Sequence, residues 1–286
     1  MRPALSFAGK NAILATMHGK ERVIAPLLDG ALGVRLRVPA GFDTDRFGTF
    51  SREVERAGTQ LDAARAKIAA ALERDPHASI GVASEGSFGP HPLIPVLPYY
   101  REIVVLIDRE TGFELVGHHS GSLTNFGHAI VSGAAEAMVF AERIGFPKHG
   151  VIVIGHAERQ PAPDRFQAKD IETASQLRRA VGQAVERCGE AFVESDMRAH
   201  RNPTRMRAIR RATVELVRRY RSACPACGRP GFVVGELLSG LPCAWCGGLT
   251  RAIKAEVRIC TGCGHRVQRP TGVTRAQPGE CAACNP

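Results

Sequence analysis

The cysteines of this 286-residue chain are concentrated near its C-terminal end, in closely spaced pairs. Eight of the nine lie after residue 223, and two residues separate the members of each pair. The pairs are Cys224/Cys227, Cys243/Cys246, Cys260/Cys263 and Cys281/Cys284. Two C-x-x-C segments can place four thiolates around one tetrahedral ion, and the spacings C-x2-C-x15-C-x2-C and C-x2-C-x17-C-x2-C are typical of zinc ribbons. The sequence therefore predicts two structural zinc ions rather than a set of disulfides.

Two ways of sharing the four pairs between two ions are compatible with this spacing. Pairing the first with the second and the third with the fourth keeps each loop short, and this is the arrangement that we expect. An interleaved arrangement, in which the first and third pairs share an ion, stays open. The stretch GFVVGELLSGLP is expected to form two short strands around a turn. Shells of four thiolates leave no open coordination position, so the ions are expected to hold the fold of the tail rather than to catalyse.

The net charge of +10 is distributed unevenly along the chain. Residues 1–196 hold 22 Lys and Arg against 24 Asp and Glu, whereas residues 197–286 hold 16 against 4. This excess indicates an anionic partner for the C-terminal third, such as nucleic acid, unless the arginines only face solvent. The chain has no run of about 18 apolar residues and no apolar stretch typical of a secretory signal near its start. A cytoplasmic protein without a membrane partner is therefore expected.

Apolar periodicity divides the chain into three parts. Within residues 1–200, strand-like apolar runs alternate with segments of helical spacing, which favours an α/β body with a mixed sheet and flanking helices. Residues 201–222 are predicted to form a basic linking helix, and residues 223–286 to form a small domain of tandem zinc ribbons. The arginines expected on the outer side of the helix, where they contact either nucleic acid or water, are Arg207, Arg210, Arg211, Arg218 and Arg219.

The body resembles the inosine triphosphatase and Maf-like nucleotide pyrophosphatase superfamily over residues 11–116. The run ATMHGKERVIAPLL is similar to the opening of that family, in which a strand ending in Ala-Thr precedes a loop with a lysine, here Lys20. The segment ERAGTQLDAARAKIAAAL is similar to the family's Glu-x-Gly-x-Thr motif and following helix, with Glu55, Thr59 and Lys67 in register. The segment GVASEGSFG resembles the strand that presents an acidic residue, here Glu85.

This resemblance implies an inosine triphosphatase-like fold and a metal-dependent phosphohydrolase that acts on a nucleotide or a similar anionic metabolite, as a nucleoside triphosphate pyrophosphohydrolase does. Such chemistry needs a divalent ion, cations on the phosphates and a base, so Mg2+ or Mn2+ is the expected catalytic cofactor. Glu85 is expected in a glycine-bounded loop just past an apolar strand. The candidate catalytic residues are Glu85, Glu55, Lys20 and His18, and the candidate substrate-binding residues are Thr59, Lys67 and Arg205, the last from a weaker similarity at NPTRMRAIRRA.

A second class of function stays open. The family's loop Asn-Pro-Gly-Lys is replaced here by Met17-His18-Gly19-Lys20, and its helix asparagine by Ala63. These departures favour a zinc-ribbon nucleic-acid-binding protein whose α/β body does not catalyse. The whole chain, including ATMHGKE, FGTF, ASEGSFGPHP and DMRAHRNPTRM, also resembles an uncharacterised bacterial family of unknown function.

Overall fold

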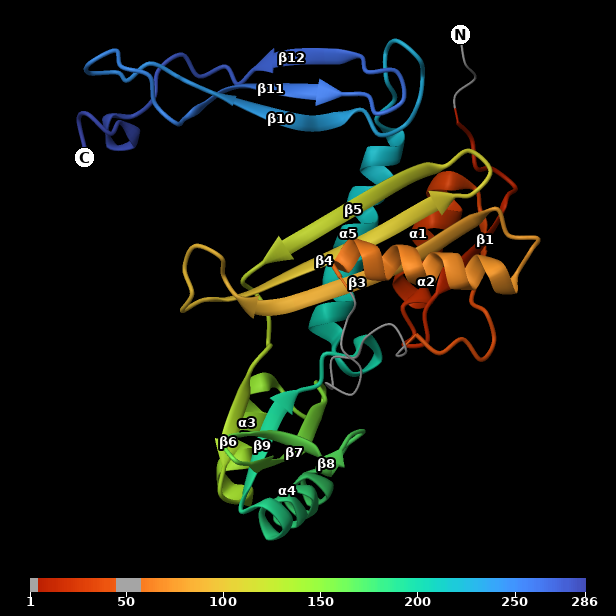
Figure 1. The fold of residues 1–286 in the computed structure, drawn as a ribbon, viewed down its shortest axis with the longest axis vertical. Coiled ribbons are helices and arrows are strands. Elements are labelled where there is room, and N and C mark those ends of the chain that lie inside the picture. The colour runs from red at the N-terminus through yellow and green to blue at the C-terminus, as the bar shows by residue number, and fades with distance from the viewer. Residues whose placement is uncertain (1–4, 45–57) are drawn as a thin grey trace. The chain divides into compact units, whose positions relative to one another are not determined.

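The structure, a computed structural model, describes residues 5–44 and 58–286 (Figure 1). It separates into two compact units. The first is Phe7–Val217, and the second is Arg218–Pro286 together with the described start of the chain, Leu5 and Ser6. Within the described ranges, every helix is too short or too polar to cross a lipid bilayer.

The first unit contains a five-stranded mixed sheet with the order β2-β1-β3-β4-β5. Its strands are β1 (Asn11–Ala15), β2 (Arg35–Arg37), β3 (Ile80–Pro90), β4 (Pro98–Asp108) and β5 (Phe113–Gly121). β1, the second strand in this order, is parallel to both β2 and β3, whereas β3, β4 and β5 are antiparallel neighbours. Because β1 and β3 run in the same direction, the loop that follows β1 lies beside the part of β3 that continues past Ala83.

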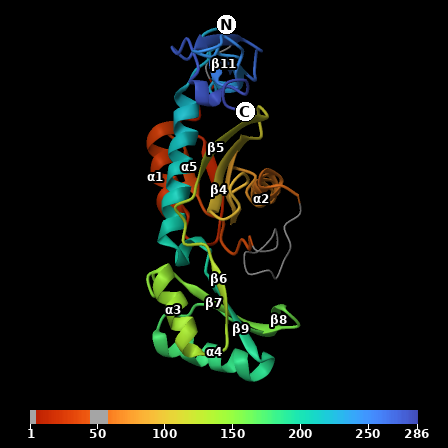
Figure 2. The same cartoon turned by 90° about the vertical axis from the view of Figure 1, so that its left-hand side faces the viewer.

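Helices cover both faces of this sheet. Figures 1 and 2 show α2 (Gln60–Arg74) on one face, with α1 (Glu21–Leu32) and α5 (Pro203–Arg221) on the other. A Cβ atom at Gly81 would overlap Ile68 of α2, and a Cβ atom at Gly117 would overlap the backbone of Ala212 in α5. Glycine at these two positions therefore lets both helices pack directly on the strands.

The first unit also contains a second, four-stranded sheet with the order β6-β9-β7-β8. Its elements are β6 (His128–Val131), α3 (Ala134–Ile144), β7 (Val151–Ala157), β8 (Gln160–Ala168), α4 (Ala174–Cys188) and β9 (Glu190–Ser195). Val153 and Val193 of this sheet pack with Phe140 of α3 and Leu177 of α4 in a core of their own. The expected mixed α/β class is confirmed, but the expectation of a single sheet was wrong, because among the described residues these antiparallel strands pair only with one another.

A short 3-10 helix, Ala199–Arg201, follows β9 and precedes α5. The buried side of α5 includes Arg205, Ile209 and Leu216. Four of the arginines predicted to face outward are exposed, and the fifth, Arg219, is half-buried. The predicted amphipathic character of this helix is therefore confirmed.

The second unit is built around a three-stranded antiparallel sheet with the order β10-β11-β12 (Figure 1). The strands are β10 (Val233–Ser239), β11 (Ile253–Ile259) and β12 (Arg266–Pro270), and a 3-10 helix, Pro278–Glu280, follows them. The prediction of two short strands within GFVVGELLSGLP was wrong. A bulge between Val234 and Glu236 absorbs Gly235, so β10 stays paired with β11 as one continuous strand.

Candidate functional site

The eight tail cysteines form two groups with the geometry of a metal site. Within each group the Sγ atoms lie within 4.8 Å of one another, and the groups are Cys224, Cys227, Cys260, Cys263 and Cys243, Cys246, Cys281, Cys284. Two Sγ–Sγ distances in each group are 3.7 and 3.8 Å. A tetrahedral shell with Zn–S bonds of about 2.3 Å requires sulfur atoms about 3.8 Å apart. The donor set and the distances therefore fit one zinc ion in each group.

The pairing is interleaved, so the expectation that consecutive C-x-x-C segments share an ion was wrong. The path of the three strands explains this arrangement. β10 carries the chain away from the first segment, β11 carries it back to the third, and β12 carries it away again to the fourth. The first and third segments therefore meet at one end of the sheet, and the second and fourth meet at the other.

The thiols of each group share negative charge. The backbone N–H groups of Cys246 and Trp245 donate to the sulfur of Cys243 and lower the pKa of that thiol to about 7. The pKa of Cys284 is raised to about 12, first by its hydrogen bond with Cys246 and then by burial. One thiolate thus forms readily while a neighbour keeps its proton, and a divalent cation would displace the remaining protons.

A second concentration of charge lies in the first unit, and Lys20 is its centre. Lys20 directly precedes α1, after the loop that follows β1, and only 6% of the residue is exposed. Its Nζ donates to the backbone oxygen of Ser84 at 3.1 Å. Burial, and after it the positive charge of Arg205, lower the pKa of Lys20 to about 7, although the negative charge of Glu85 opposes both effects. The amine is therefore close to half-protonated at neutral pH.

Lys67 and Glu85 form a buried ion pair on the face of the sheet that α2 covers. Their side chains are 8% and 4% exposed. Gln60, in the first turn of α2, donates to the backbone oxygen of Glu85 at 3.3 Å. The expectation that Glu85 lies in a glycine-bounded loop was wrong, because β3 continues to Pro90 and pairs with β4 along its whole length.

Glu102 and Arg205 form a second buried ion pair on the opposite face of the sheet. The distance from Arg205 Nε to Glu102 Oε1 is 2.7 Å, and the side chains are 1% and 0% exposed. Gly86 pairs with Glu102 across the β3–β4 ladder, and a Cβ atom there would overlap the Glu102 carboxylate and lie 2.9 Å from Arg205 Nη2. Glycine at position 86 therefore leaves the space that this ion pair occupies.

The structure thus brings four predicted residues together with one that the sequence did not single out. Lys20, Lys67, Glu85 and Arg205 were predicted, and Glu102 joins them as an additional carboxylate. Glu102 is the acid that opens the apolar run IVVLI in a buried strand, and this signal could have identified it. Two buried polar atoms, Ser84 Oγ and Glu102 Oε2, have no hydrogen-bond partner among the described residues.

Two histidines lie close together after β1 and before α5. The rings of His18 and His200 are stacked, with centroids 5.1 Å apart and an angle of 20° between planes. Burial lowers the pKa of His200, and the charge of His18 lowers it further. His18 was a predicted site residue, whereas His200 was missed because nothing in the sequence indicates that it meets the loop after β1.

Thr59 has a structural position rather than a place among these charges. Its side chain caps α2 by accepting from the backbone N–H of Asp62, and the Asp62 carboxylate in turn accepts from the Thr59 N–H at 3.0 Å.

Glu55, predicted to assist at a divalent ion, lies outside the described residues. Within residues 5–44 and 58–286, the cysteine groups are the clusters of three or more ligand side chains close enough to hold a metal.

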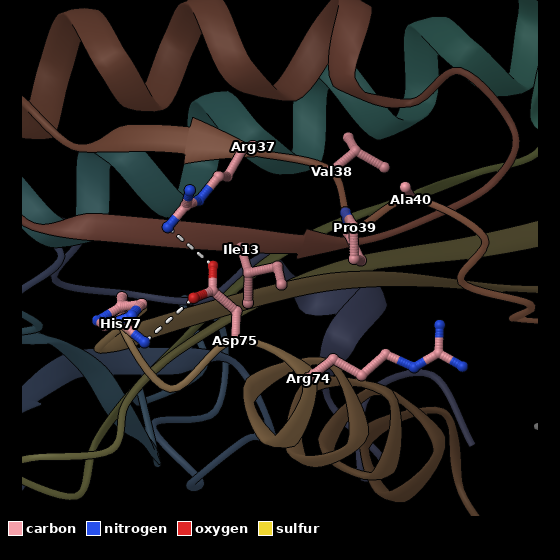
Figure 3. A pocket seen from close by; sticks show the side chains of 8 residues that line it. All are labelled: Ile13, Arg37, Val38, Pro39, Ala40, Arg74, Asp75 and His77. Atoms are coloured by element: carbon pink, nitrogen blue, oxygen red, sulfur yellow. Dashed lines mark hydrogen bonds and ion pairs between the residues drawn. The ribbon is translucent and has the colours of Figure 1, made fainter.

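A separate surface pocket lies at the β2 edge of the first sheet (Figure 3). Its volume is about 510 Å3, and its lining residues are Ile13, Arg37, Val38, Pro39, Ala40, Arg74, Asp75 and His77. Asp75 pairs with Arg37 at 2.9 Å and accepts from the backbone N–H of His77 at 3.1 Å. None of the predicted site residues lines this pocket.

Comparison with known proteins identifies a family without a known activity. No curated protein matches the chain. Residues 67–286 match the domain of unknown function DUF6671. This match includes Lys67, Glu85, Glu102, Arg205 and all eight cysteines of the two groups. The chain therefore belongs to the DUF6671 family.

Proposed function

We propose that the α/β body is a phosphohydrolase that acts on a nucleotide or a similar anionic metabolite, with its phosphates bound beyond the carboxyl end of β1. One observation carries this proposal, the buried surplus of positive charge at that place. Three cations, Lys20, Lys67 and Arg205, interact there with two carboxylates. Buried charge is costly unless it is balanced, so an anionic ligand would be bound with a net electrostatic gain.

Lys20 is the residue best suited to meet a phosphate. It adjoins the N-terminus of α1, where the helix dipole favours negative charge. Because burial lowers its pKa to about 7, an incoming anion would favour the protonated amine and gain an ion pair. The hydroxyl of Ser84, buried beside it, would add a hydrogen-bond donor.

Glu85 and the histidines supply groups that can move a proton. Glu85 is paired with Lys67, and its carboxylate could accept a proton from water. His200, whose pKa is lowered by burial, is neutral near pH 7 and offers a second acceptor beside His18. The described residues form no carboxylate cluster that would hold Mg2+ or Mn2+, so such an ion would arrive on the phosphates of the substrate, neutralise part of their charge and polarise the phosphoryl oxygens.

The similarity to the inosine triphosphatase and Maf-like superfamily supports the same proposal. Lys20, Lys67 and Glu85 occupy motif positions of that family and come from three separate segments of the chain. An inosine triphosphatase-like fold remains part of this proposal. A common role in binding one ligand explains why these segments bring charged side chains into a buried place.

The test is product release from a panel of nucleotides by the zinc-loaded full-length chain with Mg2+ or Mn2+, with phosphate and pyrophosphate measured separately. Lys20→Met should lower turnover by a factor on the order of 10² because it removes the cation nearest the proposed phosphates. Lys10→Met is the matched control, since Lys10 is bound to Asp108 and Glu110 outside the charge cluster. No product from any nucleotide, or full turnover by Lys20→Met, contradicts the proposal.

The role of Glu85 needs a variant that keeps the fold. Glu85→Gln alone leaves the buried Lys67 charge without its partner, and such a change costs about 3–5 kcal/mol of stability. The double variant Glu85→Gln/Lys67→Met removes both charges and should stay folded by circular dichroism. Its turnover should also fall by a factor on the order of 10². A folded double variant with unchanged turnover would remove Glu85 from the mechanism.

A further inference from the structure

The single tryptophan of the chain lies in the first of the two C-x-x-C segments of the second cysteine group, and its side chain is on the outside. Trp245 lies between Cys243 and Cys246 and is 77% exposed. Its backbone N–H donates to Cys243 Sγ at 3.4 Å, so the metal-binding turn fixes its main chain. A large aromatic side chain held outward on a rigid turn is costly to expose and gains free energy when another flat ring covers it.

A guanidinium lies beside this turn. The strand-like segment after β12 pairs with the turn, since Ala244 N–H donates to the oxygen of Ala276 at 3.0 Å. The preceding residue, Arg275, donates from Nη1 to the oxygen of Ala244 at 3.4 Å and is itself exposed. The guanidinium of Arg275 is therefore bound to the residue that directly precedes the exposed Trp245, and the two side chains together suit a ligand with both aromatic rings and negative charge.

One face of the adjoining sheet is basic. Lys254, Glu256 and Arg258 follow one another along β11 at intervals of two residues. Arg269 of β12 is directly opposite Glu256. Side chains two residues apart share a face of a strand, as do directly paired residues, so three cations and one carboxylate lie on this face. Nε of Arg258 is buried without a hydrogen-bond partner among the described residues.

The opposite face has its charges neutralised. Arg266 of β12 forms an ion pair with Glu236 of β10 on that side. Residues 222–286 hold seven Lys and Arg against three Glu, and two zinc sites of four thiolates each would offset the whole of this excess. Attraction of an anion must therefore come from the arrangement of the cations on one face and not from the total charge of the unit.

We propose that Trp245, Arg275 and the face bearing Lys254, Arg258 and Arg269 form a binding site for single-stranded nucleic acid. A base stacks on the indole of Trp245, and Arg275 and the basic face of the sheet contact the phosphates on either side. Unpaired bases offer their flat surfaces for stacking, whereas bases within a duplex are already stacked on one another. The site is independent of the proposed phosphohydrolase, because it lies wholly in the second unit.

The single tryptophan gives a direct readout. The zinc-loaded full-length chain is titrated at low salt with an oligothymidylate of about 12 nucleotides, and the fluorescence of Trp245 is recorded. Stacking should quench this fluorescence in a saturable way, and affinity should fall with salt with a logarithmic slope of about −0.7 per phosphate contact. Equal affinity for a duplex of the same length would overturn the proposal. The absence of quenching would also overturn it, and this is the result expected if a protein covers Trp245 instead.

Variants separate stacking from charge, with binding followed by the anisotropy of a labelled oligothymidylate. Trp245→Ala should weaken binding about ten-fold or more, and Trp245→Phe should restore part of the loss because it retains an aromatic face. Arg269→Ala should weaken binding and flatten its salt dependence, whereas Arg266→Ala, which removes an equal charge from the other face of the same strand, should change it little. Unchanged affinity in Trp245→Ala, or equal losses in the two arginine variants, would overturn the assignment.

Discussion

The ammonium of Lys20 donates to the backbone oxygen of Ser84 at 3.1 Å, which joins the loop after β1 to the neighbouring parallel strand β3. Through this contact a lysine from the connection between β1 and α1 meets the residue that directly precedes Glu85. It also buries the amine beside Arg205 and Lys67, two cations from distant parts of the chain. The charges of the proposed phosphate site are thus assembled around a single hydrogen bond.

The buried amine predicts a specific dependence of stability on pH. The pKa of Lys20 is about 7 in the folded chain, against an ordinary value of 10.5, so between these values the unfolded chain binds more protons. The free energy of unfolding should therefore rise with pH from about 7 toward 10.5, by about 1.4 kcal/mol per pH unit at most. Urea unfolding at pH 7, 8 and 9 should show this rise in the native chain relative to Lys20→Met. Equal pH dependence in the two proteins would mean that Lys20 titrates normally.

The Glu102–Arg205 ion pair predicts that position 86 cannot accept a side chain. Gly86→Ala should destabilise the body by about 1–3 kcal/mol, because the new methyl group must displace a buried carboxylate. Gly89→Ala is the matched control in the same strand, since a Cβ atom there meets nothing within 4 Å. Urea midpoints for both variants measure the difference. Similar stabilities would show that the ion pair moves aside freely.

The interleaved pairing predicts which double variants lose one zinc ion and which lose two. Cys224→Ser/Cys260→Ser removes two ligands from one group and should leave one zinc per chain in native mass spectrometry. Cys224→Ser/Cys243→Ser removes one ligand from each group and should lose both ions. Pairing of consecutive segments would reverse these two results.

Removal of zinc should unfold the second unit and spare the first. The strands β10, β11 and β12 bury few large apolar side chains, and both ends of their sheet are held by cysteine groups. Chelation should therefore abolish hydrogen-exchange protection in these strands while β7 and β9, which have their own core, stay protected. Retained protection in β11 after complete removal of zinc would show that the sheet folds without metal.

The sequence was most informative where a local pattern decides the structure. C-x-x-C spacing identified all eight cysteines of the two groups, and arginines three and four residues apart identified the exposed side of α5. The pairing of the cysteines could not be predicted, because it depends on the direction of three strands that the loop lengths do not determine. The extent of β3 was missed for a similar reason, since Gly86 and Gly89 suggest a loop and only pairing with β4 keeps them extended.

Two contacts between distant segments had no signal in the sequence. His18 meets His200, and Glu102 meets Arg205 across 103 residues of sequence. Neither pair has a local spacing that indicates it, and both depend on how α5 packs on the first sheet. The division of the body into two sheets likewise depends on which strands pair, and the order of strands and helices alone does not determine it.

The central claim, that Lys20 and its neighbours bind a phosphorylated anion, is tested most directly by proton uptake on ligand binding. Calorimetric titration of the full-length chain with inorganic pyrophosphate at about pH 8, in two buffers of different ionisation enthalpy, measures the protons taken up. The native chain should take up as much as about one proton more than Lys20→Met, because the bound anion raises the pKa of Lys20 above its value of about 7. Absence of binding, or the same uptake in both proteins, would contradict the claim.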